Sequence, residues 1–186
     1  LHDRARRLEA EGRDVIRLTA GEPDLPTPPE LVATLTGALA RGRTGYSNGR
    51  GEAALLLALA RKYSRRSGRE IAPRNILAFP GTQTALYAVM MALAETGSEV
   101  LVGDPSYATY EGVIRATGAV PVPVPLRPER GFRLDVQDVA ARVTPRSRVL
   151  LLNSPHNPTG AVLNAADIRA LGDLARAREL WIVSDE

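Results

Sequence analysis

Apolar and polar positions along the chain predict strands and helices in alternation. Short apolar runs typical of buried strands lie at 15–18, 76–79, 99–102, 149–152 and 180–184. Longer segments with helical spacing of apolar residues lie at 1–11, 29–40, 52–66, 82–95, 107–117, 135–143 and 165–178. Residues 120–124 continue the strand pattern, and their prolines place them either at a sheet edge or in an extended connection. This order predicts an α/β fold, with a mostly parallel sheet covered by helices.

Composition excludes several classes of protein. The chain has 186 residues, of which 44% are hydrophobic and 24% charged, as in an ordinary globular domain. It has no cysteine and only two histidines, so disulfides are excluded and a metal site is not expected. Its basic residues are scattered, which does not favour nucleic-acid binding. Without a long apolar run or a signal-peptide pattern, we expect a cytoplasmic protein that does not span a membrane.

The segment 153–160 directly follows the apolar run at 149–152 and contains Asn157. In open α/β sheets, ligands bind beyond the carboxyl ends of the strands. Asn157 is therefore a candidate ligand-binding residue. The same residue types also suit a plain turn between a strand and a helix, so the segment alone leaves both interpretations open.

The junction at 79–86 passes from a predicted strand to a predicted helix through Gly81, Thr82 and Gln83. Amide groups at a helix start bind anions, and the segment lacks both the lysine of a P-loop and the glycine spacing of a dinucleotide site. A single phosphate group therefore fits better than a nucleotide. The alternative is that Thr82 only caps the helix.

Two further strand ends provide candidate residues. Tyr107 follows the run at 99–102, where its ring can stack on a flat ligand, although burial against the next helix explains it equally well. Asp185 follows the run at 180–184, and a protonated ring nitrogen is one partner for its carboxylate. A phosphate site, a stacking ring, an amide and a carboxylate together describe a pyridoxal phosphate site.

These residues belong to motifs that resemble, in order, the class I/II aminotransferases of the fold-type I pyridoxal-phosphate superfamily. The motifs lie at 21–24, 46–51, 80–86, 104–107, 157–160 and 184–186. The resemblance implies a three-layer αβα large domain in which 81–83 holds the cofactor phosphate and Tyr107 stacks on the pyridine ring. It also implies that Asn157 hydrogen-bonds the phenolic oxygen and that Asp185 pairs with the pyridinium nitrogen.

The resemblance extends to residues outside these strand ends. It implies that the backbone of Gly21 approaches the substrate carboxylate and that Tyr46 reaches the cofactor phosphate of a neighbouring subunit, in a homodimer with shared active sites. It also implies that Pro105 and Pro158 follow cis peptide bonds.

The family's cofactor-binding lysine and its carboxylate-binding arginine would both lie beyond Glu186. Lys62, the only lysine, lies among arginines on the polar side of a predicted helix and cannot replace the missing one. We therefore expect a longer protein, in which 1–40 lies near a small domain and the active site. Residues 41–186 would form part of the cofactor-binding large domain.

The expected activity of the intact protein is transfer of an amino group between an amino acid and a 2-oxo acid. Two alternatives on the same scaffold remain open: a β-lyase acting on sulfur amino acids, and a cofactor-sensing domain of a transcription regulator. A generic nucleotide-binding domain is less well supported, because the glycine fingerprint is absent.

Overall fold

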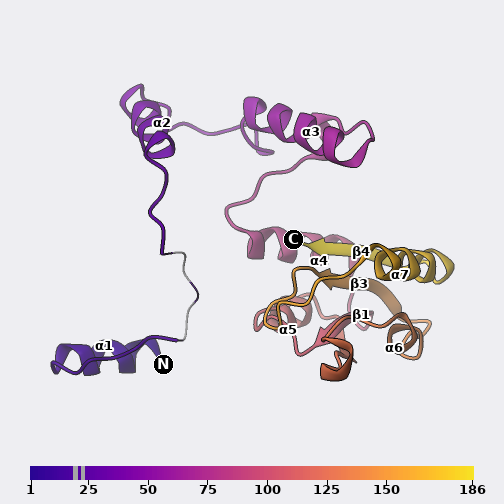
Figure 1. Cartoon of the computed structure of the whole chain (residues 1–186). Coiled ribbons are helices and arrows are strands. Elements are labelled where there is room, and N and C mark those ends of the chain that lie inside the picture. The colour runs from indigo at the N-terminus through magenta and orange to yellow at the C-terminus, as the bar shows by residue number, and fades with distance from the viewer. Residues whose placement is uncertain (19–20, 22–23) are drawn as a thin grey trace. The chain divides into compact units, whose positions relative to one another are not determined.

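The computed structural model describes residues 1–18, 21 and 24–186, which fall into two units, Leu1–Gly49 and Arg50–Glu186 (Figure 1). The first unit contains helices α1 (His2–Ala10) and α2 (Pro29–Ala40), as the sequence predicts. The strand predicted at 15–18 is wrong: this segment is irregular, with Ile16 and Leu18 exposed. A strand needs a neighbouring strand to accept its hydrogen bonds, and the described part of this unit offers none.

The second unit begins with helix α3 (Ala53–Ser67) and the short helix η1 (Pro73–Asn75). The strand predicted at 76–79 is also wrong, because the sheet of the described residues does not include this segment. Its Ala78 amide donates to the Arg50 carbonyl at 2.8 Å, and Leu77 is exposed. An apolar run is therefore not sufficient for a strand where no strand lies beside it.

The sheet of the second unit has four parallel strands in the order β2-β1-β3-β4. These are β1 (Glu99–Asp104), β2 (Val120–Pro125), β3 (Ser147–Asn153) and β4 (Trp181–Asp185). The proline-rich β2 lies at an edge, which confirms the expectation from its missing amide donors. Because all pairs are parallel, the strands end at one edge of the sheet, where Asn153 is the register partner of Asp185.

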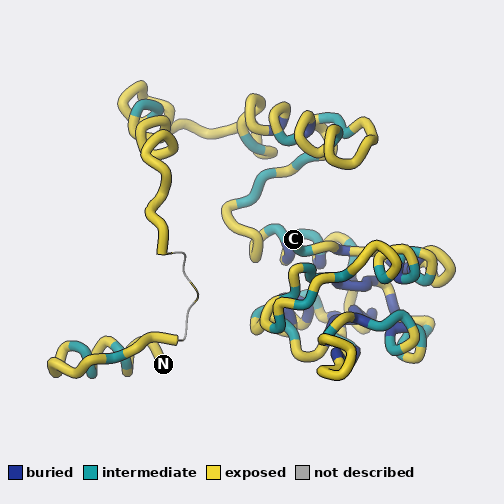
Figure 2. Tube along the Cα trace, in the orientation of Figure 1, coloured by how far each residue is buried: buried dark blue, intermediate teal, exposed yellow. Residues whose placement is uncertain are grey.

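Helices cover both faces of this sheet. Helices α4 (Thr82–Leu93) and α5 (Tyr110–Arg115) pack on the face that carries Val100 and Val102, whereas α6 (Val136–Ala140) and α7 (Ala165–Ala177) pack on the face that carries Leu101. A short helix, η2 (Pro128–Arg130), follows β2. The most buried positions lie in the sheet and on the helix faces that pack against it (Figure 2). The three-layer αβα architecture is thus confirmed.

Side-chain caps mark the starts of α6 and α7. The side chain of Asn164 caps α7 by accepting from the amides of Ala166 and Asp167 at 2.8 and 2.9 Å. The Asp167 carboxylate in turn accepts from the Asn164 backbone amide at 3.0 Å, completing a capping box.

None of the helices in the described residues is both long enough and apolar enough to cross a membrane.

A buried carboxylate joins two strands at the amino end of the sheet. Glu99, at the start of β1, accepts hydrogen bonds from Thr144 at 2.5 Å, from Arg146 at 2.6 Å and from Ser147 at 3.0 Å. Burial by itself raises the pKa of Glu99, but these three donors outweigh it and hold the pKa below 4.5. This cluster links β1 to the start of β3 at the end of the sheet opposite the candidate site.

Candidate functional site

A hollow of about 280 Å³ lies at the carboxyl edge of the sheet. It is lined by the start of α4, the loop after β1 and the ends of β3 and β4, with the residues Thr82, Gln83, Leu86, Tyr107, Tyr110, Asn153, Asn157, Asp185 and Glu186. Five residues singled out from the sequence therefore line one hollow: Thr82, Gln83, Tyr107, Asn157 and Asp185. This is where open α/β sheets bind ligands.

Thr82 and Gln83, at the start of α4, line this hollow, whereas Gly81 directly precedes them and is not among its lining residues. Gly81 is the N-cap, with φ 95°, a conformation that glycine adopts without strain. Thr82 is the first helical residue, so the alternative that Thr82 only caps the helix is wrong. The first amides of a helix have no partner within the helix, and they carry its positive dipole end. The turn at Gly81, Thr82 and Gln83 is therefore suited to an anion.

Tyr107 lies on the loop between β1 and α5 and is 38% exposed. Its ring meets the ring of Tyr110 edge to face, with centroids 5.5 Å apart and an interplanar angle of 73°. Tyr107 is thus supported at one side by a buried ring while part of its own ring remains accessible. Burial against the helix does not account for the whole side chain.

Asp185 at the end of β4 has a partner that sequence reasoning did not find. The Tyr110 hydroxyl donates to Asp185 Oδ2 at 2.5 Å, across 75 residues of chain. Burial, and then the Asp185 carboxylate, raise the pKa of Tyr110, so its hydroxyl remains a donor. A carboxylate has room for several donors, and within the described residues no second side chain donates to the Asp185 carboxylate.

The loop after β3 carries Asn157 into the hollow. The backbone amide of Asn157 donates to Asn153 Oδ1 at 2.7 Å. The Asn157 side chain is exposed and has no hydrogen-bond partner within the described residues. The Asp104–Pro105 and Asn157–Pro158 peptide bonds are cis, which confirms the prediction. The Ser154–Pro155 bond is cis as well, which the sequence analysis did not foresee.

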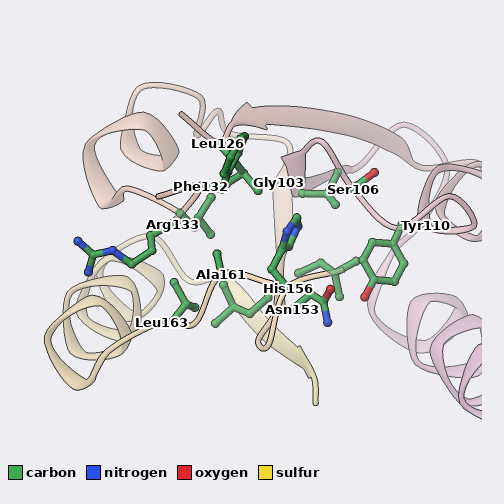
Figure 3. Close-up of a pocket in the computed structure, with 14 residues that line it drawn as sticks. Gly103, Ser106, Tyr110, Leu126, Phe132, Arg133, Asn153, His156, Ala161 and Leu163 are labelled. Carbon is green, nitrogen blue, oxygen red and sulfur yellow. The ribbon is translucent and has the colours of Figure 1, made fainter. Parts of the chain in front are cut away.

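A second cavity, beside the first, is lined mainly by apolar side chains such as Leu126, Phe132 and Leu163 (Figure 3). Its volume of about 20 Å³ holds roughly one water molecule. The His156 ring lies in this cavity, with its Nδ1 2.7 Å from the Thr159 hydroxyl. Burial lowers the pKa of His156, and a hydrogen bond to the Pro105 backbone opposes this effect in part. His156 therefore supports the loop after β3, and the cavity is too small for an organic ligand.

Gly21 and Tyr46 belong to the first unit and are described there alone. Both are exposed, and the Tyr46 side chain is fully so. Glu22 and Pro23, which complete the first motif, lie outside the described residues. Lys62 is an exposed residue of α3, with its ammonium 5.9 Å from the ring centre of Tyr63, and it does not line the hollow.

The chain is an α/β protein, and the residues that line this hollow have side chains and backbone groups suited to an anionic group, a flat ring and a cationic atom. Comparison with known proteins identifies the family: residues 13–186 match the model for aminotransferase class I and II. The chain therefore belongs to the class I and II aminotransferases.

Individual relatives agree with this assignment. The chain is 44% identical over its whole length to the arginine–pyruvate transaminase of Pseudomonas aeruginosa, and covers 47% of that protein. It is 39% identical over 98% of its length to a probable aspartate/prephenate aminotransferase of Thermus aquaticus, and covers 48% of it. The chain thus spans about half the length of these relatives.

Solved structures show the same fold. Aspartate aminotransferase from Thermus thermophilus with maleate matches 100% of the chain with a TM-score of 0.95 and 38% identity, and the chain covers 48% of it. Aspartate aminotransferase from Thermotoga maritima matches 100% of the chain with a TM-score of 0.95 and 33% identity, with 49% covered. The αβα layers found here are therefore those of the aminotransferase fold.

Proposed function

We propose that the intact protein is a pyridoxal-phosphate-dependent aminotransferase that moves an amino group between an amino acid and a 2-oxo acid. Two observations support this proposal. The chain belongs to the class I and II aminotransferases, and the relatives named above are transaminases. The hollow at the carboxyl edge of the sheet is also lined by residues whose chemistry suits such a cofactor.

The residues of the hollow fit the chemical parts of pyridoxal phosphate. The amides at the start of α4 suit its phosphate, because they lack partners within the helix. The partly exposed ring of Tyr107 offers a surface for the pyridine ring. The side-chain amide of Asn157, which has no hydrogen-bond partner within the described residues, matches the phenolic oxygen, and the carboxylate of Asp185 matches the protonated nitrogen.

When bound, pyridoxal phosphate supplies an electron sink for the electron pair released as the amino acid loses its α-proton. Asp185 would keep the ring nitrogen protonated, because a carboxylate beside it favours the charged form. The Tyr110 hydroxyl at 2.5 Å from Oδ2 holds this carboxylate at the end of β4. Asp185 is therefore the residue that we expect turnover to depend on most strongly.

The remaining residues of the hollow would bind and orient the cofactor. Gly81, Thr82 and Gln83 would hold the phosphate through backbone amides and through the hydroxyl and amide side chains of Thr82 and Gln83. Tyr107 would stack on the ring, and Asn157 would donate a hydrogen bond to the phenolic oxygen. These contacts fix the plane of the ring relative to the substrate.

The proposal extends to residues of the first unit and to a second subunit. We place the backbone of Gly21 at the substrate carboxylate and Tyr46 at the phosphate of the neighbouring subunit in a homodimer. The full exposure of Tyr46 is compatible with a contact to another chain. The division proposed is 1–40 near the small domain and 41–186 in the large domain, with the cofactor-binding lysine and the carboxylate-binding arginine after Glu186.

The single observation that best supports this function is the joint placement of Thr82, Tyr107, Asn157 and Asp185 around one hollow. The test is nitrogen transfer in the intact protein with added pyridoxal phosphate. A panel of ¹⁵N-labelled amino acids, including arginine and aspartate, is incubated with pyruvate or 2-oxoglutarate. We expect ¹⁵N in the amino acid formed from the 2-oxo acid, detected by mass spectrometry.

Other outcomes of the same test identify the alternatives. Release of ¹⁵N-ammonia together with pyruvate from a sulfur amino acid would indicate a β-lyase. Binding of the cofactor without any ¹⁵N transfer from the panel would indicate a sensor domain. Either result would overturn the aminotransferase proposal.

A further inference from the structure

Asn153, the last residue of β3, joins the two side-chain positions that face the proposed cofactor ring. Its Oδ1 accepts from the Asn157 amide at 2.7 Å, and its Nδ2 donates to the Asp185 carbonyl at 3.0 Å. The first bond is local and the second crosses to β4, 32 residues away. One amide side chain thus ties the loop of Asn157 to the strand end of Asp185.

The two bonds are not equally important for their partners. The Asp185 carbonyl also accepts from the Ser154 amide, at 3.3 Å, so it keeps a donor without Asn153. Within the described structure, the Asn157 amide has Asn153 Oδ1 as its hydrogen-bond partner. Loss of the Asn153 side chain would therefore leave the Asn157 backbone amide without this partner, while β4 stays paired through its ladder and the rest of the loop keeps its own hydrogen bonds.

The Asn153 side chain donates and accepts at the same time, and its acceptor is the part that serves Asn157. An asparagine amide does both, whereas a carboxylate accepts only. Asn153 is half-buried, so water replaces its bonds only in part, and the strand fixes its backbone. Figure 3 shows the Asn153 side chain on the side of the apolar cavity where Tyr110 also lies.

We propose that Asn153 is a positioning residue that holds the Asn157 side chain in line with the phenolic oxygen of the cofactor. This inference rests on the proposed function, because it assumes that Asn157 contacts pyridoxal phosphate. Asn153 itself acts through the Asn157 backbone and does not need to touch the cofactor. Its effect must therefore depend on the presence of the Asn157 side chain.

A double-mutant cycle on the intact apoenzyme tests this dependence. The dissociation constant of pyridoxal phosphate is measured by absorbance titration for the wild type, Asn153→Ala, Asn157→Ala and the double variant. We expect Asn153→Ala to weaken binding about tenfold in the wild-type background, as the loss of the hydrogen bonds that orient Asn157. In the Asn157→Ala background, the same change should weaken binding less than about threefold.

Asn164→Ala is the matched control. It removes another asparagine whose Oδ1 accepts from backbone amides, at the start of α7 and outside the hollow. Its effect on thermal stability should resemble that of Asn153→Ala, but the affinity for the cofactor should stay at the wild-type value. A general loss of stability is thereby separated from a loss of positioning.

Asn153→Asp provides a second route if Asn153→Ala does not fold. Aspartate keeps an oxygen that accepts from the Asn157 backbone amide. Any effect of its charge on cofactor binding should be the same in the wild-type and Asn157→Ala backgrounds. We therefore expect the change in dissociation constant caused by Asn153→Asp to differ by less than about threefold between these two backgrounds. Equal weakening by Asn153→Ala in both backgrounds, or coupling in Asn153→Asp, would overturn the positioning role. Failure of the wild type to bind the cofactor would instead overturn the proposed function.

Discussion

Replacing Tyr110 with phenylalanine removes one hydroxyl beside Asp185 and little else. The Tyr110 ring is buried and packs with the α4 and α5 core, so Tyr110→Phe leaves this packing and creates no cavity. The hydroxyl donates to Asp185 Oδ2 at 2.5 Å, and its loss frees the carboxylate to rotate. The variant therefore isolates the contribution of this single hydrogen bond.

The magnitude follows from the burial of the two partners. A hydrogen bond to a charged group contributes about 1.5–3 kcal/mol, but Asp185 is only half-buried, so water replaces part of it. Ordering the freed carboxylate again on cofactor binding costs up to about 1 kcal/mol. We expect the affinity for pyridoxal phosphate to fall by about 1 kcal/mol, or roughly fivefold.

The assay is titration of the intact apoenzyme with pyridoxal phosphate, with Tyr87→Phe as control. Tyr87 is 41% exposed and does not line the hollow. The pKa of Tyr110 is raised above 10.0, so its hydroxyl contributes fully below pH 10 and is lost only at still higher pH. The difference between Tyr110→Phe and the wild type should therefore be constant between about pH 6 and pH 9. An affinity equal to that of Tyr87→Phe would refute the reasoning.

Three further changes probe other parts of the account. Glu99→Gln should lower the stability at pH 7 by about 1–3 kcal/mol in urea unfolding. Because the pKa of Glu99 in the folded protein lies below 4.5, the difference in stability between wild type and Glu99→Gln should be full above pH 4.5 and should disappear as the pH falls through that pKa. Glu95→Gln, at an exposed position, is the control. Asp185→Asn keeps the shape but removes the charge, so ¹⁵N transfer should fall about a thousandfold or more, and near-wild-type rates would rule out its role. Tyr107→Ala should weaken cofactor binding about tenfold, whereas Tyr107→Phe should bind like the wild type; equal losses would argue against stacking.

Sequence patterns were sufficient for elements with strong local signals. The apolar run of β3 and the amphipathic helix α7 were predicted within a few residues. The segments at 15–18 and 76–79 show the limit of such reasoning. Both have the apolar character of strands, but a strand exists only where a neighbour accepts its hydrogen bonds, and the described residues include none beside either segment.

The candidate site was predictable where a residue type at a strand end indicates a ligand. Tyr107, Asn157 and Asp185 were selected in this way, and all three line the hollow. Tyr110 and Asn153 were not, because their roles arise from contacts across 75 and 32 residues that no local pattern encodes. Asn153 ends a strand as Asp185 does, and a pair of polar strand ends in adjacent strands was the signal available for it.

The central claim is that Asp185 pairs with the protonated ring nitrogen of pyridoxal phosphate at the end of β4. The most direct measurement is the ¹⁵N NMR spectrum of the intact protein loaded with cofactor labelled at that nitrogen. We predict a protonated nitrogen in the wild type at neutral pH and a largely unprotonated one in Asp185→Asn. A nitrogen that is unprotonated in the wild type, or protonated to the same extent in both proteins, would contradict it.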